Sequence, residues 1–413
     1  MINYEKFELE NGLRVIFHED KTTPLAVVNI LYDVGARDES EERTGFAHLF
    51  EHLMFGGSKN IENYDAPLQL AGGECNAFTS NDITNYYNTV PAQNLETAFW
   101  LESDRMLELA FTPKSLEVQR NVVVEEFKQR YLNQPYGDVW LEFRPLIYKK
   151  HPYKWPTIGK KIEHIQEAVM EDVKSFFYKF YGPQNAILVV AGNTSLDEVK
   201  RLSEKYFGSI PKREKAIRNI PAEPAQKEYR EKLIERDVPS DAIYMAFRMG
   251  KRNSRDYYLG DLTSDILGNG KSSRLYDELV NESKKFTTIS AYITGSMEDG
   301  LLVVSGRPAK GVNFDEAKKC ISEVITSLLD QEIGKNELTK VKNKFKTAKV
   351  FGEQSLVNRA MNLAFFEELD MLSEMDQEID KYDSITSKEL FDFATKTFKE
   401  TNTSTLLIKS KNG

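Results

Sequence analysis

Two of the chain's five histidines lie four residues apart in the segment 44–56, which reads TGFAHLFEHLMFG. Residues four apart share one face of a helix, so His48 and His52 can direct their imidazoles at one metal ion. Glu51 follows His48 by three residues and lies on nearly the same face, where its carboxylate can take a proton from metal-bound water. This spacing predicts a zinc peptidase. The alternative is an ordinary helix in which backbone or carboxylate groups satisfy both histidines.

A catalytic zinc ion normally has three protein ligands and one open position for water. The third ligand is expected to be a carboxylate, because no other histidine lies near this segment in the sequence. Residues 112–127 predict a helix that carries candidates, with Thr112 as N-cap and Pro113 at its first position. The remaining histidines are His18, His151 and His164.

Two glutamates near the end of this helix compete for the role of third ligand. Glu126 shares a stripe with Val122 and Val123. Glu125 lies on a more polar face and could form a surface ion pair with Lys128. We therefore predict that Glu126 is the ligand. Glu125 is the alternative, and a solvated charge is the ordinary role of either side chain.

Three segments together resemble the pitrilysin/insulinase family of inverzincins, in particular its mitochondrial processing peptidase-like bacterial members. They are the inverted zinc motif, the segment 72–87 (GGECNAFTSNDITNYY) and the segment 120–126 (RNVVVEE). The resemblance covers nearly the whole chain. It implies that His48, His52 and Glu126 bind zinc, and that Glu51 is the general base of peptide hydrolysis.

The same resemblance implies that residues 76–79 form an edge strand that pairs with an extended peptide substrate. Main-chain hydrogen bonds from an open strand edge can hold any extended peptide, while alternate side chains enter pockets. The pattern alone also allows an ordinary central strand. The residues expected to bind substrate are Asn76, Ala77, Phe78 and Thr79.

Composition excludes several classes of protein. A net charge of −9 without a basic block argues against binding of nucleic acid. The sequence contains no run of 18 apolar residues, so we expect no membrane span. The first ten residues are too charged for a signal peptide. We therefore expect a cytoplasmic protein. Cys75 and Cys320 are the only cysteines, which makes a disulfide framework or a cysteine-rich metal site unexpected.

The chain contains two weak internal echoes at nearly one offset. Residues 27–37 are echoed by 242–252, an offset of 242 minus 27, or 215, and residues 173–181 by 390–398, an offset of 217. This repetition predicts two duplicated domains. No histidine follows His164, so we expect zinc only in the first copy. The predicted divisions are 1–210 for the zinc-binding catalytic domain, 211–227 for a proline-containing linker and 228–413 for the non-metal domain.

Each half is predicted to place strands before helices, which indicates an α+β fold. Each domain is expected to be a mainly antiparallel sheet covered by helices on one side, and the family resemblance makes this pair half of a peptidase clamshell. A hairpin turn is predicted at Asn11-Gly12. The predicted strands are 25–34 and 83–90; the predicted helices are 94–109, 113–131, 167–181, 314–330, 335–349 and 387–399.

The second half departs from the family pattern. Active members that complete their own site carry an Arg and, seven residues later, a Tyr after a segment like 272–279, and these bind substrate carbonyls and stabilise the oxyanion. Val280 and Thr287 occupy those positions here. A shifted register would instead use Lys284, Lys285 and Tyr292.

We therefore predict that the chain is the zinc-bearing subunit of an endopeptidase, which hydrolyses extended or unfolded peptides in an enclosed chamber. A related two-domain subunit would supply the Arg and Tyr, or two copies of this chain would form a homodimer. The alternative is a non-catalytic peptide-binding subunit or a structural core subunit.

Overall fold

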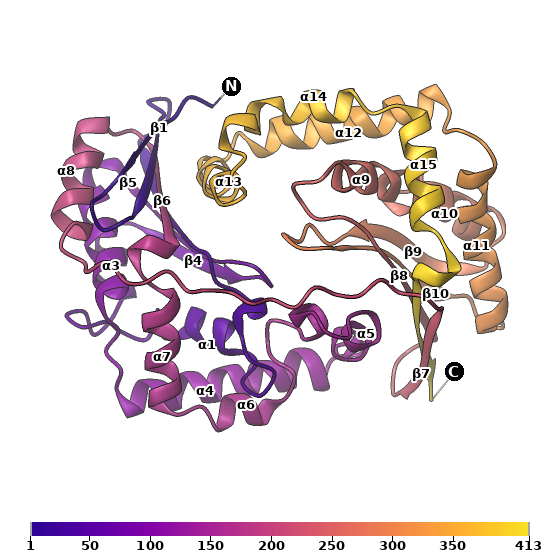
Figure 1. Ribbon diagram of the computed structural model, residues 1–413, viewed down its shortest axis with the longest axis horizontal. Helices are drawn as coiled ribbons and strands as arrows, with labels where there is room; N and C mark the ends of the chain where they lie inside the picture. Colours follow the sequence, from indigo (N-terminus) through magenta and orange to yellow (C-terminus); the bar gives the residue numbers. More distant parts are fainter. Residues whose placement is uncertain (1, 412–413) are drawn as a thin grey trace. The chain divides into compact units, whose positions relative to one another are not determined.

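A computed structural model describes residues 2–411, which form two compact units, each built on one sheet with helices packed against it (Figure 1). The first unit contains residues 2–130, 151–221 and 350–376. The second contains 131–150, 222–349 and 377–411. This architecture confirms the predicted α+β class.

The sheet of the first unit has the strand order β1-β2-β6-β3-β5-β4. All neighbouring strands are antiparallel except β2 and β6. Its centre is almost wholly apolar, since every residue of β6 is buried. The strands are β1 (Glu5–Glu8), β2 (Arg14–Glu19), β3 (Leu25–Tyr32), β4 (Glu74–Thr79), β5 (Thr84–Pro91) and β6 (Ala186–Gly192).

The sheet of the second unit repeats this topology with the order β7-β11-β8-β10-β9. Among the described strands of this sheet, β7 and β11 form the one parallel pair, as β2 and β6 do in the first sheet; β1 has no counterpart. The strand β8 therefore corresponds to β3, and β9 to the edge strand β4, which agrees with the echo of residues 27–37 at 242–252. The strands are β7 (Arg230–Arg236), β8 (Ala242–Arg248), β9 (Phe286–Ile293), β10 (Leu301–Pro308) and β11 (Thr403–Ser410).

Helices cover both faces of the first sheet. On one side α3 packs on β3 and β5, and α8 packs on β2. On the other side α13 packs on β3 and β6 (Figure 1). The expectation of helices on one side only is wrong for this unit, because a helix from the second half of the chain covers the remaining apolar face. The helices are α1 (Phe46–Leu53), α2 (Asp65–Leu70), α3 (Leu95–Leu107), α4 (Pro113–Phe127), α6 (Ile162–Gln166), α7 (Met170–Phe180), α8 (Leu196–Phe207) and α13 (Leu356–Glu368).

A helix from the first half of the chain joins the second unit in the same way, since α5 packs on β7 and β11. Each compact unit thus contains a helix from the other half of the chain. The predicted divisions at 1–210, 211–227 and 228–413 concern the duplicated domains and remain a proposal. Residues 1 and 412–413 lie outside the described residues. The helices of the second unit are α5 (Val139–Ile147), α9 (Arg255–Gly268), α10 (Arg274–Tyr276), α11 (Phe314–Asp330), most of α12 (Lys335–Gly352), α14 (Glu378–Asp383) and α15 (Ser387–Thr397).

Local sequence signals account for many of these boundaries. The side chain of Thr112 accepts a hydrogen bond from the backbone N–H of Ser115 and caps α4, as predicted. The turn between β1 and β2 contains Gly12, whose φ of +88° favours glycine. The predicted strands and helices all have counterparts, with ends that differ by a few residues.

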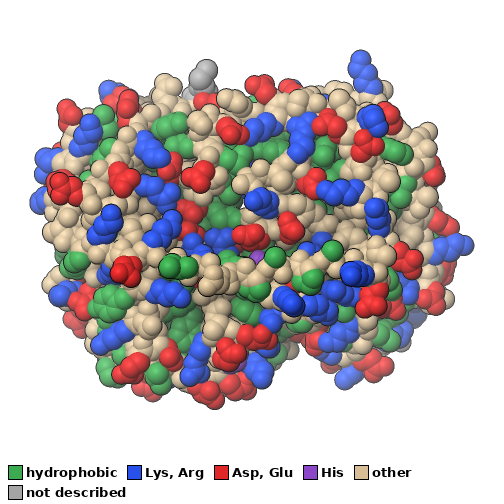
Figure 2. Space-filling view, in the orientation of Figure 1, with side chains coloured by type: hydrophobic (Ala, Val, Ile, Leu, Met, Phe, Trp, Pro, Cys, Tyr) green, Lys and Arg blue, Asp and Glu red, His purple; other side chains and the backbone are tan. Residues whose placement is uncertain are grey.

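Positive and negative side chains are interspersed on the face seen in Figure 2. This face therefore lacks the concentrated basic patch that a nucleic-acid binder needs. Within residues 2–411, no helix combines the length and the apolar character needed to cross a membrane.

Candidate metal centre

The helix α1, which carries His48, Glu51 and His52, begins at an unusual N-cap. Gly45 has a φ of +89° and no side chain to cap the helix. A Cβ at this position would lie 2.7 Å from the carbonyl oxygen of Ile158, so a larger residue would be strained and would clash. Glu39 takes over the capping, because its carboxylate accepts hydrogen bonds of 2.9 Å from the N–H groups of Gly45 and Ala47.

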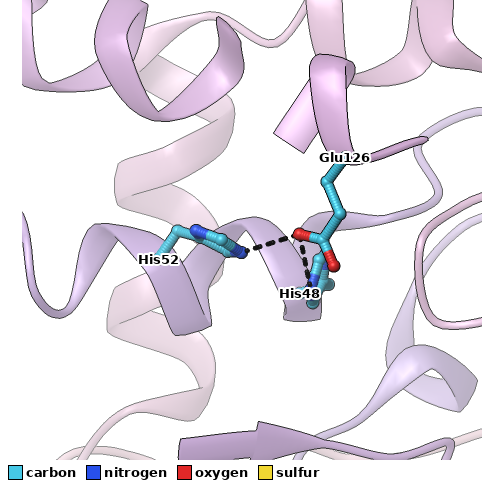
Figure 3. Close-up of side chains that lie close together, drawn as sticks. All are labelled: His48, His52 and Glu126. Carbon is cyan, nitrogen blue, oxygen red and sulfur yellow. Dashed lines mark ion pairs between the residues drawn. The ribbon is translucent and has the colours of Figure 1, made fainter. Parts of the chain in front are cut away.

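The three predicted metal ligands converge in the first unit (Figure 3). Both histidines point from α1 toward Glu126, which lies near the end of α4. The Oε2 atom of Glu126 lies 3.3 Å from Nε2 of His52 and 3.7 Å from Nε2 of His48. One ligand atom from each residue lies within 4.8 Å of the others, and within residues 2–411 no other group of three or more His, Cys, Asp or Glu side chains has this spacing.

The neighbouring glutamate points elsewhere. The side chain of Glu125 is 60% exposed and forms an ion pair of 2.6 Å with Lys128, as the helical spacing indicated. The side chain of Glu126 is 17% exposed, and its second oxygen, Oε1, forms an ion pair of 2.9 Å with Arg130. The geometry therefore favours Glu126 over Glu125 as the third ligand.

The protonation states of His48 and Glu126 favour the binding of a metal cation. Burial lowers the pKa of His48 to about 4, against the opposing effect of the Glu126 carboxylate. The hydrogen bond with His52 holds the pKa of Glu126 below its ordinary value. At neutral pH the imidazole of His48 is therefore neutral and Glu126 is ionised, and metal binding requires these states.

The chemistry of this donor set suits zinc, which takes imidazole nitrogen and carboxylate oxygen at about 2.0–2.2 Å. Three protein ligands leave the fourth tetrahedral position open, as in catalytic zinc sites. The residues present therefore fit a catalytic zinc ion, although their role as ligands stays a prediction.

The predicted general base is held by a hydrogen bond. Thr79 Oγ1 donates to Oε2 of Glu51 at 2.6 Å. Burial raises the pKa of Glu51, and the bond from Thr79 opposes that rise. A carboxyl pKa that moves upward toward neutrality suits a group that must both accept and release a proton.

Residues 76–79 lie on β4, which among residues 2–411 pairs with β5 alone and forms one edge of the sheet. The central-strand alternative is therefore wrong. Asn76 and Phe78 are exposed, whereas Ala77 and Thr79 are partly buried on the other face. Binding of a peptide by these four residues stays a prediction.

Three contacts of this site were not predicted. The Arg130–Glu126 pair has the i,i+4 spacing of helical ion pairs, and this spacing could have indicated it. The bonds that Glu39 accepts from the start of α1, and the bond that Thr79 donates to Glu51, join residues that no local pattern connects.

Comparisons with known proteins agree with this geometry. Residues 14–152 match the family described as insulinase (peptidase family M16), and residues 168–345 match the peptidase M16 inactive domain. The zinc protease PqqE of Helicobacter pylori is 31% identical over 347 residues, which cover 82% of this chain and 78% of that protein. The chain belongs to peptidase family M16.

Other M16 relatives include the mitochondrial-processing peptidase subunit beta of Saccharomyces cerevisiae, which is 28% identical over 268 residues, or 63% of this chain and 57% of that protein. The crystal structure of a protease from Helicobacter pylori has a TM-score of 0.94 and 28% identity, and the match covers 99% of this chain and all of that one. The periplasmic protease PqqL from Escherichia coli, at 18% identity and a TM-score of 0.83, shares the fold; the match covers this whole chain and 48% of that one.

Val280 and Thr287, at the positions where the family resemblance predicts an Arg and a Tyr, lie in the second unit. Val280 packs against its apolar core, and the Thr287 hydroxyl donates to the carbonyl of Arg307 at 3.2 Å. Of the residues that a shifted register would use, Lys285 forms an ion pair with Glu316, and burial raises the pKa of Tyr292 to about 12.

Proposed function

We propose that this M16 chain is the zinc-bearing subunit of an endopeptidase that hydrolyses extended or unfolded peptides. The observation that carries the proposal is the convergence of His48, His52 and Glu126, with Glu51 on the same helix as both histidines. A scaffold protein has no need of this combination. The zinc proteases among its relatives give the proposal independent support.

In the proposed reaction, His48, His52 and Glu126 hold the metal, and Glu51 moves the proton. Bound zinc would polarise the peptide carbonyl and acidify the attacking water. The carboxylate of Glu51 accepts the proton of that water and then delivers it to the leaving amine. The open edge of β4 aligns the peptide backbone by strand addition, with Phe78 and Asn76 exposed beside it.

We further propose that a second chain completes the site. Val280 has no donor, and the short Thr287 side chain bonds a backbone carbonyl in its own unit, so neither residue replaces the Arg and Tyr of the family pattern. A related two-domain subunit that carries both residues is the expected partner, and a homodimer is the other possibility.

The same substitutions favour a second candidate function, which is peptide binding without turnover by the isolated chain. Hydrolysis of a quenched fluorescent peptide library separates the two. The purified zinc-loaded chain would be assayed alone and with a related Arg- and Tyr-bearing subunit from the same source. We expect turnover in the mixture that Glu51→Gln abolishes; binding of peptide without turnover in both samples would support the second function.

A further inference from the structure

The last residue of β4 contacts the predicted general base through its side chain. Thr79 Oγ1 donates to Oε2 of Glu51 at 2.6 Å, which is a short bond for a hydroxyl donor. A hydroxyl that donates to an ionised carboxylate forms a charge-assisted bond, about twice as strong as one between neutral groups. The predicted role of Thr79 in peptide binding uses its backbone at the strand edge and leaves its hydroxyl free for this contact.

The alternation of side chains along β4 directs this contact. Exposed and partly buried residues alternate from Glu74 to Thr79, so the strand presents Ala77 and Thr79 on the face that packs on α1. The backbone of β4 can therefore pair with a peptide at its open edge while the Thr79 hydroxyl reaches α1.

The position of Thr79 is fixed by the turn that follows it. The N–H of Ser80 donates to the carbonyl of Ile83, which closes the β4–β5 hairpin directly after Thr79. Within that turn, the buried carboxylate of Asp82 pairs with Arg37 at 3.2 Å. These contacts fix the backbone that follows Thr79, and the β-branched Thr79 side chain has few χ1 rotamers, so its hydroxyl can orient a partner.

The contact uses one oxygen of the Glu51 carboxylate. Oε2 accepts the bond from Thr79, which leaves both lone pairs of Oε1 able to accept a proton from the attacking water. An unrestrained glutamate samples several rotamers, and only some of them place an oxygen correctly for proton transfer.

We infer that Thr79 is a positioning residue for Glu51, whose hydroxyl holds the carboxylate in the orientation for proton transfer and links it to the strand that receives the peptide. This role presupposes the peptidase activity proposed above. It differs from a substrate-binding role, in which Thr79 would change the affinity for peptide and leave the chemical step unchanged.

Thr79→Val and Thr79→Ser test this role, because valine keeps the shape without the hydroxyl and serine keeps the hydroxyl. Steady-state kinetics would be measured on zinc-loaded protein, with any partner that wild type needs. We expect Thr79→Val to lower kcat roughly tenfold or more, with KM within about twofold of wild type. Thr79→Ser should restore most of kcat, and all variants should bind zinc equally.

Thr84→Val is the matched control. Thr84 lies opposite Thr79 in the hairpin, and its buried hydroxyl donates to the carbonyl of Val34 at 2.9 Å. The control loses one hydrogen bond of a threonine hydroxyl that does not involve Glu51, so kcat per zinc-loaded chain should stay near the wild-type value.

The outcomes separate the inference from the proposed function. A wild-type protein without turnover, alone and with the related subunit, would overturn both. Turnover that Glu51→Gln abolishes, but that Thr79→Val leaves unchanged or alters only in KM, would overturn the role of Thr79 and leave the peptidase function standing. A drop in kcat in Thr79→Val that Thr79→Ser does not restore would also contradict the positioning role of Thr79.

Discussion

Nε2 of His52 lies 3.3 Å from Oε2 of Glu126, although the two residues belong to different helices and are 126 minus 52, or 74, positions apart. His48 approaches the same oxygen at 3.7 Å. One carboxylate oxygen thus faces two imidazole nitrogens across a space where a divalent cation could bind all three residues. The fold of the first unit holds these groups in place through contacts outside the site itself.

A buried ion pair on α3 is expected to support this unit. Glu102 and Arg105 are almost fully buried, and Arg105 Nε donates to Glu102 Oε2 at 2.9 Å. Glu102→Gln would leave the guanidinium without a charged partner, so we expect a loss of about 3–5 kcal/mol in the free energy of unfolding. Urea denaturation measures it, and a loss below about 1 kcal/mol would contradict the role of the pair.

The exposed pair of Glu198 and Arg201 on α8 is a matched control. It has the same residue types and the same i,i+3 spacing, but both side chains are at least 40% exposed. Solvent screens such a pair, so Glu198→Gln should change stability little. Equal effects of the two substitutions would show that burial does not set the strength of the Glu102–Arg105 pair.

The capping of α1 by Glu39 gives a second prediction. Glu39→Ala removes both acceptors for the N–H groups of Gly45 and Ala47, which lie at the buried start of the helix. We expect a loss of about 2–4 kcal/mol in stability, because two buried donors lose their partners. Zinc affinity, measured by competition with a chelator, should also fall, since His48 follows these residues directly. Stability and affinity equal to those of wild type would contradict this account.

The lowered pKa of Asp20 predicts that the stability of the protein depends on pH. The hydroxyl of Thr22, helped by Arg359 of α13, lowers the pKa of Asp20 to about 2 from 3.8. A carboxyl whose pKa is lowered in the folded state adds stability above its unfolded pKa and loses it as pH falls through the folded value.

Asp20→Asn should therefore cost about 2 kcal/mol at pH 7 and about half of that at pH 3. Urea denaturation of both proteins at the two pH values measures the difference. The same cost at both pH values would show that ionisation of Asp20 does not contribute.

Local patterns predicted much of the geometry of the candidate metal centre. The spacing of His48 and His52 requires only a helix, and the choice of Glu126 over Glu125 followed from the stripe of α4 on which each residue lies. The N-cap at Thr112 could be predicted for the same reason, since its bond joins residues three apart.

The contacts that depend on tertiary folding could not be predicted. Nothing in the sequence of α13 indicates that it packs on β3 and β6 of the first unit, because an apolar helical face fits either sheet. The Thr79–Glu51 bond depends on how the β4–β5 hairpin meets α1, and the Glu39 cap on how a loop returns to a helix start.

The zinc content of purified protein tests the central claim most directly. Wild type and Glu125→Gln, the matched control one residue away, should each bind about one zinc ion per chain by elemental analysis. Glu126→Gln should lose most of its zinc under the same chelator challenge. Loss of zinc from Glu125→Gln with retention in Glu126→Gln, or no zinc in wild type, would contradict the metal centre formed by His48, His52 and Glu126.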